Sequence, residues 1–82
     1  MNKDAIFQTV VHIICEVIPE LEGHPFQPDD RLVDLGANSI DRAEIVTMAL
    51  ETLSLPIARI ELSEAKNIGD LVGILYAKSQ AA

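Results

Sequence analysis

The segment DLGANSID, residues 34–41, joins the end of a loop to the start of a helix. Gly36 suits a backbone angle that other residues resist. Asn38 is a favoured N-cap residue, and Asp41, three residues on, is placed to reach back to it as in a capping box. We therefore predict that a helix begins at Asn38 or Ser39 and holds the Ser39 hydroxyl in its first turn.

The helix that follows this segment has one apolar side, which we expect to face the core. This inward stripe consists of Ala43, Val46, Ala49, Leu50 and Leu53. Pro56, reached through Ser54 and Leu55, ends the helix. A helical wheel places on the opposite side Ile40, Met48, Asp41, Glu44, Thr47 and Glu51. Apolar residues among acids indicate either a contact surface for a partner or isolated exposed residues, which are common.

An amphipathic segment from Lys3 to Ile18 predicts the first helix. The residues that recur at helical spacing on its apolar side are Ile6, Phe7, Val10, Ile13, Ile14 and Val17. Its opposite side carries Gln8, His12 and Glu16. Pro19 ends the helix, because the residue before a proline disfavours the α region.

Residues 19–37 are expected to form one long loop, since they hold three of the four prolines and two of the four glycines. A loop of this length is usually functional, or it is anchored by its own side chains. The side chains that we expect to enter the core are those of Phe26, Leu32, Val33 and Leu35.

The rest of the chain predicts a short helical turn and a last helix. The turn, Ile57–Leu62, is too brief to be stable without packing. Asn67 with Asp70 repeats the cap-and-acid pattern and begins a helix with an inward side made of Ile68, Leu71, Val72 and Leu75. No segment alternates with a period of two, so no sheet is expected. The sequence predicts an all-α single domain over residues 1–82, a four-helix bundle with three longer helices, one short helix and a long first loop.

The charge and size of the chain exclude several classes of function. Thirteen acidic and six basic residues give the 82-residue chain a net charge of −7, which repels nucleic acid and anionic membranes and attracts basic protein surfaces. A chain of this size has room for one core and no deep enzyme cleft. The apolar run Val10–Ile18 is interrupted and is far shorter than the roughly 20 residues of a membrane span. We expect a monomer without catalytic activity of its own.

The single cysteine and the two histidines offer little chemistry. Cys15 has no partner for an internal disulfide, which fits a reducing cytoplasm, and we expect a partly buried, inert side chain. His12 and His24 are far apart in the sequence. We expect them to be solvated or locally hydrogen-bonded, and we predict no metal site.

Three interpretations of Ser39 compete. It is part of a helix cap, or a hydrolase nucleophile, or a serine that another enzyme modifies. A nucleophile needs a base within hydrogen-bonding reach, and neither histidine is visibly placed to serve. The G-x-S-x-G pattern also fails, because Ala37 and Asp41 stand where it requires glycine. A modified serine needs only exposure and a rigid helix start, whose positive dipole end favours a phosphodiester.

The octapeptide quoted above closely resembles the D-L-G-x-[DN]-S-[LI]-D signature of acyl carrier proteins, and the resemblance extends over nearly the whole chain. It implies that Ser39 receives 4′-phosphopantetheine from coenzyme A through a phosphodiester bond. A separate phosphopantetheinyl transferase performs this reaction with the help of Mg²⁺. The terminal thiol of the arm then holds acyl groups as thioesters, which either fold back between the helices or swing out to a partner.

The resemblance also assigns a role to the second helix. In the family, acids of this helix meet basic partner surfaces, which implies a partner-contact surface made of Ile40, Asp41, Glu44, Met48 and Glu51. Two residues depart from the common pattern. Asn38 stands where many members have aspartate, and Arg42 interrupts the acids. Both departures should narrow the set of compatible transferases and partners.

The longer stretch GANSIDRAEIVTMALE, residues 36–51, is similar to standalone carriers of bacterial polyketide synthases. Among these, it resembles the discrete donor carriers of β-branching cassettes. Such carriers supply an acetyl unit and work with a ketosynthase-like decarboxylase and a 3-hydroxy-3-methylglutaryl (HMG) synthase homologue. The alternatives are a fatty-acid or peptidyl carrier, or a helical interaction module whose Ser39 only caps a helix.

Overall fold

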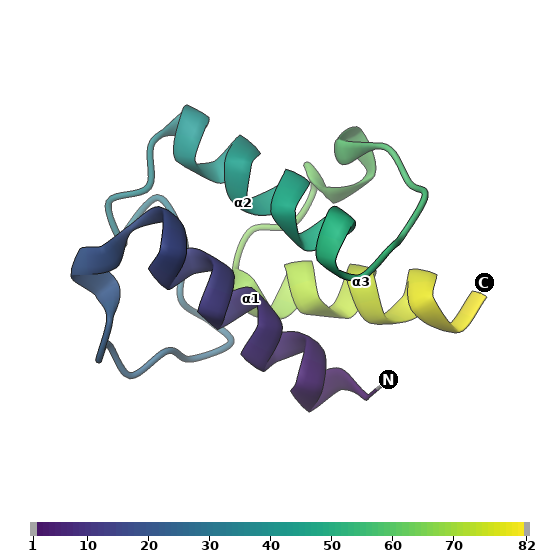
Figure 1. Cartoon of the computed structure of the whole chain (residues 1–82), viewed down its shortest axis with the longest axis horizontal. Helices are drawn as coiled ribbons and strands as arrows, with labels where there is room; N and C mark the ends of the chain where they lie inside the picture. The colour runs from purple at the N-terminus through teal and green to yellow at the C-terminus, as the bar shows by residue number, and fades with distance from the viewer. Residues whose placement is uncertain (1, 82) are drawn as a thin grey trace.

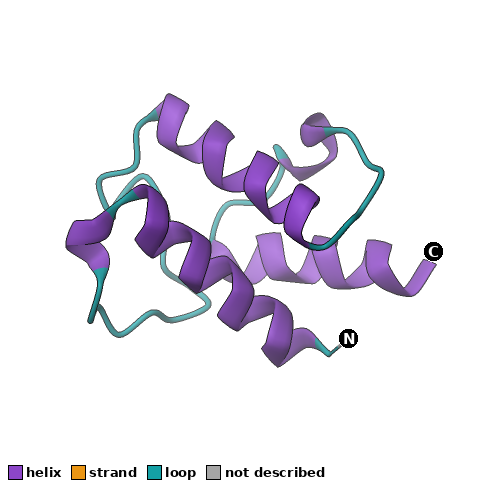
Figure 2. Cartoon of the chain, viewed as in Figure 1, coloured by secondary structure: helices purple, strands orange, loops and turns teal. Residues whose placement is uncertain are grey.

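The computed structural model describes residues 2–81, which contain three α-helices and two short 3-10 helices. In chain order these are α1 (Lys3–Val17), η1 (Pro19–Leu21), α2 (Ser39–Thr52), η2 (Arg59–Leu62) and α3 (Ile68–Ala81). Helices and loops account for all of the described residues, with no strand among them (Figure 2). The predicted all-α architecture is confirmed, and the predicted short helix is the 3-10 helix η2.

α1 packs against both α2 and α3 and so lies at the centre of the arrangement (Figure 1). The two ends of the chain lie near each other at one end of the molecule, whereas α2 begins at the other end. The molecule is 34 Å long in this direction. The Ser39 end of α2 is therefore remote from both termini.

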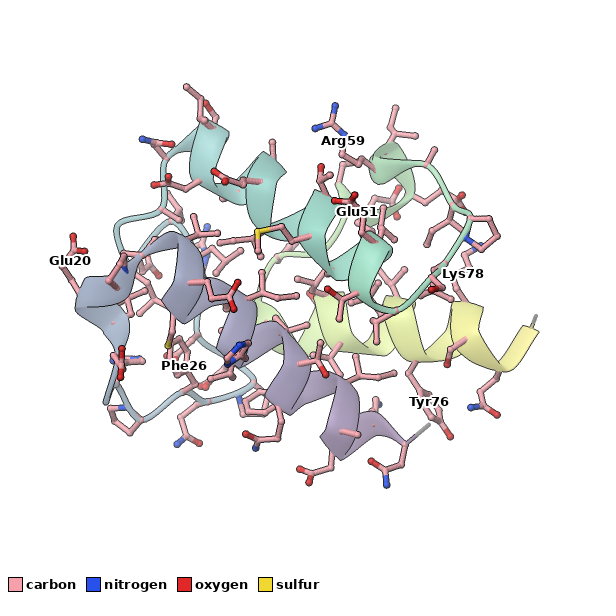
Figure 3. The ribbon with its side chains drawn as sticks, in the orientation of Figure 1. Glu20, Phe26, Glu51, Arg59, Tyr76 and Lys78 are labelled. Atoms are coloured by element: carbon pink, nitrogen blue, oxygen red, sulfur yellow. The ribbon has the colours of Figure 1, made fainter. Side chains whose placement is uncertain are left out.

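The core is built from the inward sides of the three helices, as the periodicity predicts. α1 and α3 contribute the buried residues Ile6, Val10, Ile13, Ile14, Ile68, Leu71, Val72 and Leu75. Phe26 and Tyr76 pack against the edges of this core, and Figure 3 shows them at opposite ends of α1. Burial of this apolar surface is the main stabilising term of the fold.

The buried side of α2 is wider than predicted. The five residues of the predicted stripe are all buried or half-buried: Ala43, Val46, Ala49, Leu50 and Leu53. Ile45 is not among these five, yet it is fully buried. The placement of Met48 on the solvent side is wrong, because its side chain is half-buried against the core. α2 contacts α1 and η2 at the same time, so two neighbours cover it over a broad arc.

The long segment between α1 and α2 is more ordered than a plain loop. Pro19 begins the 3-10 helix η1, and a series of hydrogen-bonded turns follows. Phe26, Leu32 and Leu35 pack against the core as predicted. Val33 does not, since 53% of it is exposed. The Ala37 N–H bonds the Leu32 carbonyl at 3.0 Å, and the turn between them directs Val33 outward.

This segment also docks on the first turn of α3. The N–H groups of Ile68 and Gly69 donate to the carbonyls of Asp30 and Pro28 at 2.9 and 2.7 Å. A helix start leaves such donors unpaired, so the loop satisfies two of them. Gly69 permits the close approach, because a Cβ at this position would lie 2.9 Å from the Pro28 oxygen. These bonds fix the first loop to α3, although α2 is the next helix in the sequence.

Side-chain capping completes the start of α3. The Asp70 N–H donates to Asn67 Oδ1 at 2.7 Å, as the cap-and-acid pattern predicts. The Asp70 carboxylate accepts the N–H of Lys66 at 3.1 Å, one residue before the cap. This carboxylate lies in the first turn, where it also stabilises the positive end of the helix dipole.

Candidate functional site

The start of α2 is held by a reciprocal pair of hydrogen bonds. Asn38 Oδ1 accepts the N–H of Asp41 at 2.8 Å, and Asp41 Oδ2 accepts the N–H of Asn38 at 3.3 Å. This is the predicted capping box, with Asn38 as the N-cap and Ser39 as the first helical residue. The backbone that carries Ser39 is therefore fixed on both sides.

The residues just before the cap are tied to the body of the molecule. Gly36 has a φ of +93°, in the left-handed region that favours glycine. The next residue, Ala37, is only 3% exposed and anchors the segment in the core. Its carbonyl accepts a hydrogen bond from Arg42 Nη1 at 2.7 Å. Arg42 thus joins the first turn of α2 to the loop that leads into it.

The Ser39 hydroxyl has no hydrogen-bond partner within the described residues, and its residue is exposed. The two histidines are engaged elsewhere. His12 Nε2 lies 2.8 Å from Glu16 on α1, and His24 Nε2 lies 3.1 Å from Asp30 within the loop. This arrangement gives Ser39 no general base and leaves its hydroxyl accessible to an enzyme from outside.

The predicted partner-contact residues lie on α2 with different degrees of exposure. Ile40 is 75% exposed, and Glu44 and Glu51 are exposed on the same side of the helix. Asp41 is half-buried and its carboxylate takes part in the capping box. Met48 is half-buried at the border of the core. Three of the five residues therefore form an open strip, and the other two lie at its edge.

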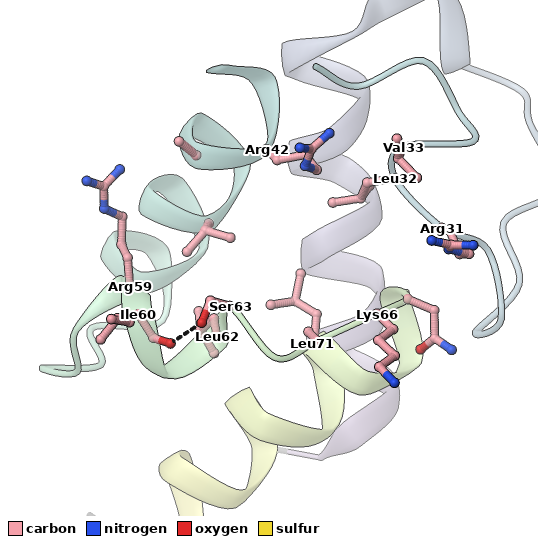
Figure 4. A pocket seen from close by; sticks show the side chains of 14 residues that line it. Arg31, Leu32, Val33, Arg42, Arg59, Ile60, Leu62, Ser63, Lys66 and Leu71 are labelled. Carbon is pink, nitrogen blue, oxygen red and sulfur yellow. Dashed lines mark hydrogen bonds between the residues drawn. The ribbon is translucent and has the colours of Figure 1, made fainter. Parts of the chain in front are cut away.

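A groove that is not evident from the sequence lies on a different side of α2 from this strip. Its volume is about 680 Å³, and its lining comes from the first loop, α2, the η2 region and the start of α3 (Figure 4). The apolar residues that line it include Leu32, Ala43, Val46, Leu62 and Leu71. Arg42, Ala43 and Val46 follow Ser39 by three, four and seven residues, so they share its side of the helix. This spacing is the sequence signal that could have indicated the groove.

Among the described residues, three groups have clearly shifted pKa values, and none of them is a predicted site residue. The backbone N–H of Gln27, together with His24, lowers the pKa of Asp30. The ammonium of Lys78, 2.8 Å from Glu61, lowers the pKa of that carboxyl. Burial, with the nearby Glu22, raises the pKa of the half-buried Cys15 thiol. A raised pKa disfavours the reactive thiolate, in agreement with the expected inert cysteine.

No group of three or more side chains that could bind a metal ion occurs among residues 2–81. Within the same residues, no helix has both the length and the apolar character needed to cross a membrane.

The features described above are those of a carrier protein, in which a rigid helix start presents an accessible serine. The family described as phosphopantetheine attachment site matches residues 8–75, and the chain belongs to this family. It is an acyl carrier protein, a class that carries covalently attached 4′-phosphopantetheine.

Two known proteins are especially informative. Over all 82 residues, and over the full length of both proteins, the chain is 61% identical to the polyketide biosynthesis acyl-carrier-protein AcpK of Bacillus subtilis (strain 168). It also matches a chain in the crystal structure of the curacin biosynthetic pathway HMG synthase in complex with acetyl donor-ACP. That match has a TM-score of 0.90 and 45% identity, and covers 94% of this chain and 99% of that chain. The predicted carrier fold, the covalent cofactor and the carrier rather than enzymatic role are thereby confirmed.

Proposed function

We propose that Ser39 is the residue to which 4′-phosphopantetheine is attached, and that residues 1–82 act as one carrier domain. The observation that carries this proposal is the exposed, unpartnered Ser39 hydroxyl at the capped start of α2. The bound group supplies a terminal thiol that forms acyl thioesters. The role of the chain itself is to position the bound group, because it holds Ser39 at a fixed point and exposes its hydroxyl.

The local electrostatics fit a phosphodiester at this position. The first N–H groups of a helix have no partner within it, and the helix dipole places partial positive charge at the same end. The Asn38 side chain accepts the N–H of Asp41, and Ser39 beside it stays exposed. A phosphate joined to Ser39 Oγ would therefore lie where negative charge is stabilised.

The attachment step is a group transfer that an external transferase performs. The Ser39 hydroxyl loses its proton to a base of that enzyme, and a bond forms between Oγ and the phosphorus of coenzyme A. The phosphorus–oxygen bond to the adenosine portion breaks, and adenosine 3′,5′-bisphosphate leaves. No residue of this chain has to act as acid or base, which agrees with the engagement of both histidines elsewhere.

Intact-mass measurement tests the attachment site. The apo protein is incubated with coenzyme A, Mg²⁺ and a broad-specificity phosphopantetheinyl transferase. We expect a gain of one phosphopantetheinyl group in the parent and in the control Ser79→Ala, and no gain in Ser39→Ala. A gain that survives Ser39→Ala, or an unchanged parent with several transferases, would refute the assignment.

We further infer that the carrier supplies acetyl units in polyketide β-branching in the cytoplasm. The name of the Bacillus relative places that protein in polyketide biosynthesis, and the matched crystal structure contains an acetyl donor carrier with an HMG synthase. The expected partners are a phosphopantetheinyl transferase, a ketosynthase-like decarboxylase and an HMG synthase homologue, which meet a monomeric carrier through Ile40, Asp41, Glu44, Met48 and Glu51.

Acetyl transfer distinguishes this role from other carrier roles. The protein is loaded with a ¹³C-labelled acetyl arm and mixed with an HMG synthase homologue, and the label on each protein is followed by mass spectrometry. A donor carrier loses its acetyl group to the enzyme within minutes, whereas a fatty-acid carrier used as a control keeps it. Equal retention by both carriers would contradict the donor role and leave the attachment site intact.

A further inference from the structure

Arg42 is the only basic residue of α2, and it lies in the same end turn as Ser39. Long side chains in a helix lean toward its N-terminal end, and this one is half-buried. Its Nη1 donates to the carbonyl of Ala37 at 2.7 Å, two residues before Ser39 in the chain. Figure 4 shows Arg42 extending from the helix toward the loop that precedes it. The guanidinium and the proposed attachment residue are therefore neighbours at the start of α2.

Most of the hydrogen-bonding capacity of this guanidinium is unused. An arginine has several N–H donors in a planar fork, and the bond to Ala37 engages one nitrogen. The acceptor is a neutral carbonyl, and Arg42 forms no ion pair with any carboxylate within residues 2–81. By contrast, Lys78 on α3 is paired with Glu61 at 2.8 Å. Arg42 thus holds a positive charge that is not neutralised by a direct contact.

A phosphodiester on Ser39 would place negative charge where acidic groups are already present. The Asp41 carboxylate accepts the Asn38 N–H at 3.3 Å and so lies at the same helix start, and Glu44 is exposed on the next turn. The end of a helix offers only about half an elementary positive charge. A guanidinium in the same turn offers a full one and reduces the repulsion between the phosphodiester and these acids.

The spacing of Ser39 and Arg42 suits a contact through the phosphate. Residues three apart on a helix have Cβ atoms about 5–6 Å from each other, which is within the span of an arginine side chain. Arg42 and the exposed Ile40 lie on opposite sides of Ser39. At 3.6 residues per turn, Arg42 is about 60° from Ser39 around the helix axis, and Ile40 is about 100° away in the other direction. A bond to Arg42 would therefore turn the root of the arm away from Ile40.

We propose that Arg42 binds the phosphodiester of the 4′-phosphopantetheine attached to Ser39 and thereby sets the direction in which the arm leaves α2. This inference rests on the proposed attachment at Ser39. The free N–H donors of the guanidinium bond the non-bridging oxygens of the phosphodiester, while Nη1 keeps its bond to Ala37. The alternative is a structural role, in which Arg42 only ties the loop to α2. That role predicts the same effect of Arg42 in the apo and the loaded protein.

Nuclear magnetic resonance of the ¹⁵N-labelled parent tests the contact without any variant. The protein is compared before and after loading with 4′-phosphopantetheine from coenzyme A, and intact mass confirms the loading. We expect the Arg42 Nε–Hε resonance to shift on loading. We also expect nuclear Overhauser contacts from the methyl groups of the arm to the side-chain methylene protons of Arg42, and none to Ile40. A resonance that loading leaves unchanged, or arm contacts to Ile40 alone, would overturn the proposal.

A thermodynamic cycle separates the contact with the arm from the structural role. Urea unfolding is measured for the parent and Arg42→Gln, each in the apo and the loaded form, so that the loss of the Ala37 bond cancels. The effect of loading on the unfolding equilibrium constant should differ between the two by about 2- to 5-fold, the range for a partly exposed ion pair. Loading should stabilise the parent relative to the variant.

Two further variants assign this effect to the guanidinium. Arg42→Lys keeps the charge and loses the planar fork, so it should retain part of the difference. Lys3→Gln, which removes a base at the other end of the molecule, should behave as the parent. An equal effect of loading on the parent and Arg42→Gln would overturn the proposal and leave Arg42 with the structural role. Failure to load Ser39 in the parent would instead refute the proposed function.

Discussion

The N–H of Leu55 donates to the carbonyl of Leu50 at 3.0 Å, across the turn that ends α2. Ser54 lies between them with a φ of 54°, and its N–H donates to the carbonyl of Glu51 at 3.2 Å. These two bonds form a Schellman motif, and the two residues whose side chains usually meet in this motif, Leu50 and Leu55, both belong to the buried core. The position between them normally holds glycine, and here it holds serine.

Ser54→Gly should therefore stabilise the protein. The change removes a Cβ from a left-handed position and keeps both hydrogen bonds, so we expect the free energy of unfolding to rise by about 0.5–1 kcal/mol. Urea unfolding followed by circular dichroism measures this change. The control Ser54→Ala keeps a Cβ and should show no gain, and equal stability of the two variants would rule out the strain.

The capping box at Asn38 gives a second prediction. Asn38→Ala removes the acceptor for the Asp41 N–H and should lower the free energy of unfolding by about 1 kcal/mol. Asn38→Asp keeps an acceptor and adds negative charge at the helix start, so its stability should stay within a few tenths of a kcal/mol of the parent or exceed it. Thermal and urea unfolding of both variants measure these changes. An Asn38→Ala variant with the same free energy of unfolding as the parent would contradict the capping role.

The two glycines of α3 form a matched pair for a third prediction. Gly69→Ala places a Cβ 2.9 Å from the Pro28 oxygen and should push the first loop off the helix, at a cost of about 1–3 kcal/mol. Gly73→Ala meets no atom within 4 Å and should stabilise the helix by up to about 1 kcal/mol. Urea unfolding of both variants measures the two changes in the free energy of unfolding. If both variants are stabilised, the close contact between Gly69 and Pro28 is not needed to hold the loop.

The bonds of Asp30 predict a dependence of stability on pH. Its carboxylate accepts the Gln27 N–H at 2.9 Å and contacts His24, which lowers its pKa in the folded chain. The folded state then binds fewer protons than the unfolded state, so this contribution is fully present above the unfolded pKa, about 3.9, and is lost as the pH falls through the lower folded value.

Asp30→Asn should remove that dependence. The difference in unfolding free energy between the parent and Asp30→Asn should be largest above about pH 5 and should shrink toward pH 3. Urea unfolding at a series of pH values measures it, with Asp29→Asn as the control at an exposed neighbouring carboxylate. A difference that stays constant over this range would exclude the charged carboxylate as its source.

The exposed acids of α2 predict the kinetics of partner binding. Glu44→Lys or Glu51→Lys should slow association with an HMG synthase homologue by about 3- to 10-fold at low salt, mainly through the association rate constant. High salt should reduce the difference by screening. Glu20→Lys, an exposed acid on η1, serves as the control for net charge, and stopped-flow fluorescence measures the rates (Figure 3). Unchanged rates for all three variants would contradict the acidic surface.

The sequence predicts the helices well because local signals determine them. The period of Ile6, Val10 and Ile13 identifies the buried side of α1, and the Asn38–Asp41 spacing identifies the start of α2. The position of the exposed serine follows from the same cap. These features depend on residues no more than a few positions apart, so no knowledge of the packing is needed.

The errors arise where several elements meet. A helical wheel assumes one buried side, but α1 and η2 both cover α2, which buries Ile45 and half-buries Met48. Val33 lies in a turn that is closed by the bond from the Ala37 N–H to the Leu32 carbonyl, and its side chain is exposed there, which hydrophobicity alone does not reveal. The groove joins residues from four separate segments, so only its α2 part has a signal in the sequence.

Both chain ends lie at the extremity of the molecule away from the beginning of α2 (Figure 1). An affinity tag or a fused enzyme at either end would therefore lie away from Ser39, where the acyl group is proposed to be carried. We therefore expect that the protein can be fused to a larger polypeptide, or immobilised on a solid support, through either end while the start of α2 stays accessible to other enzymes.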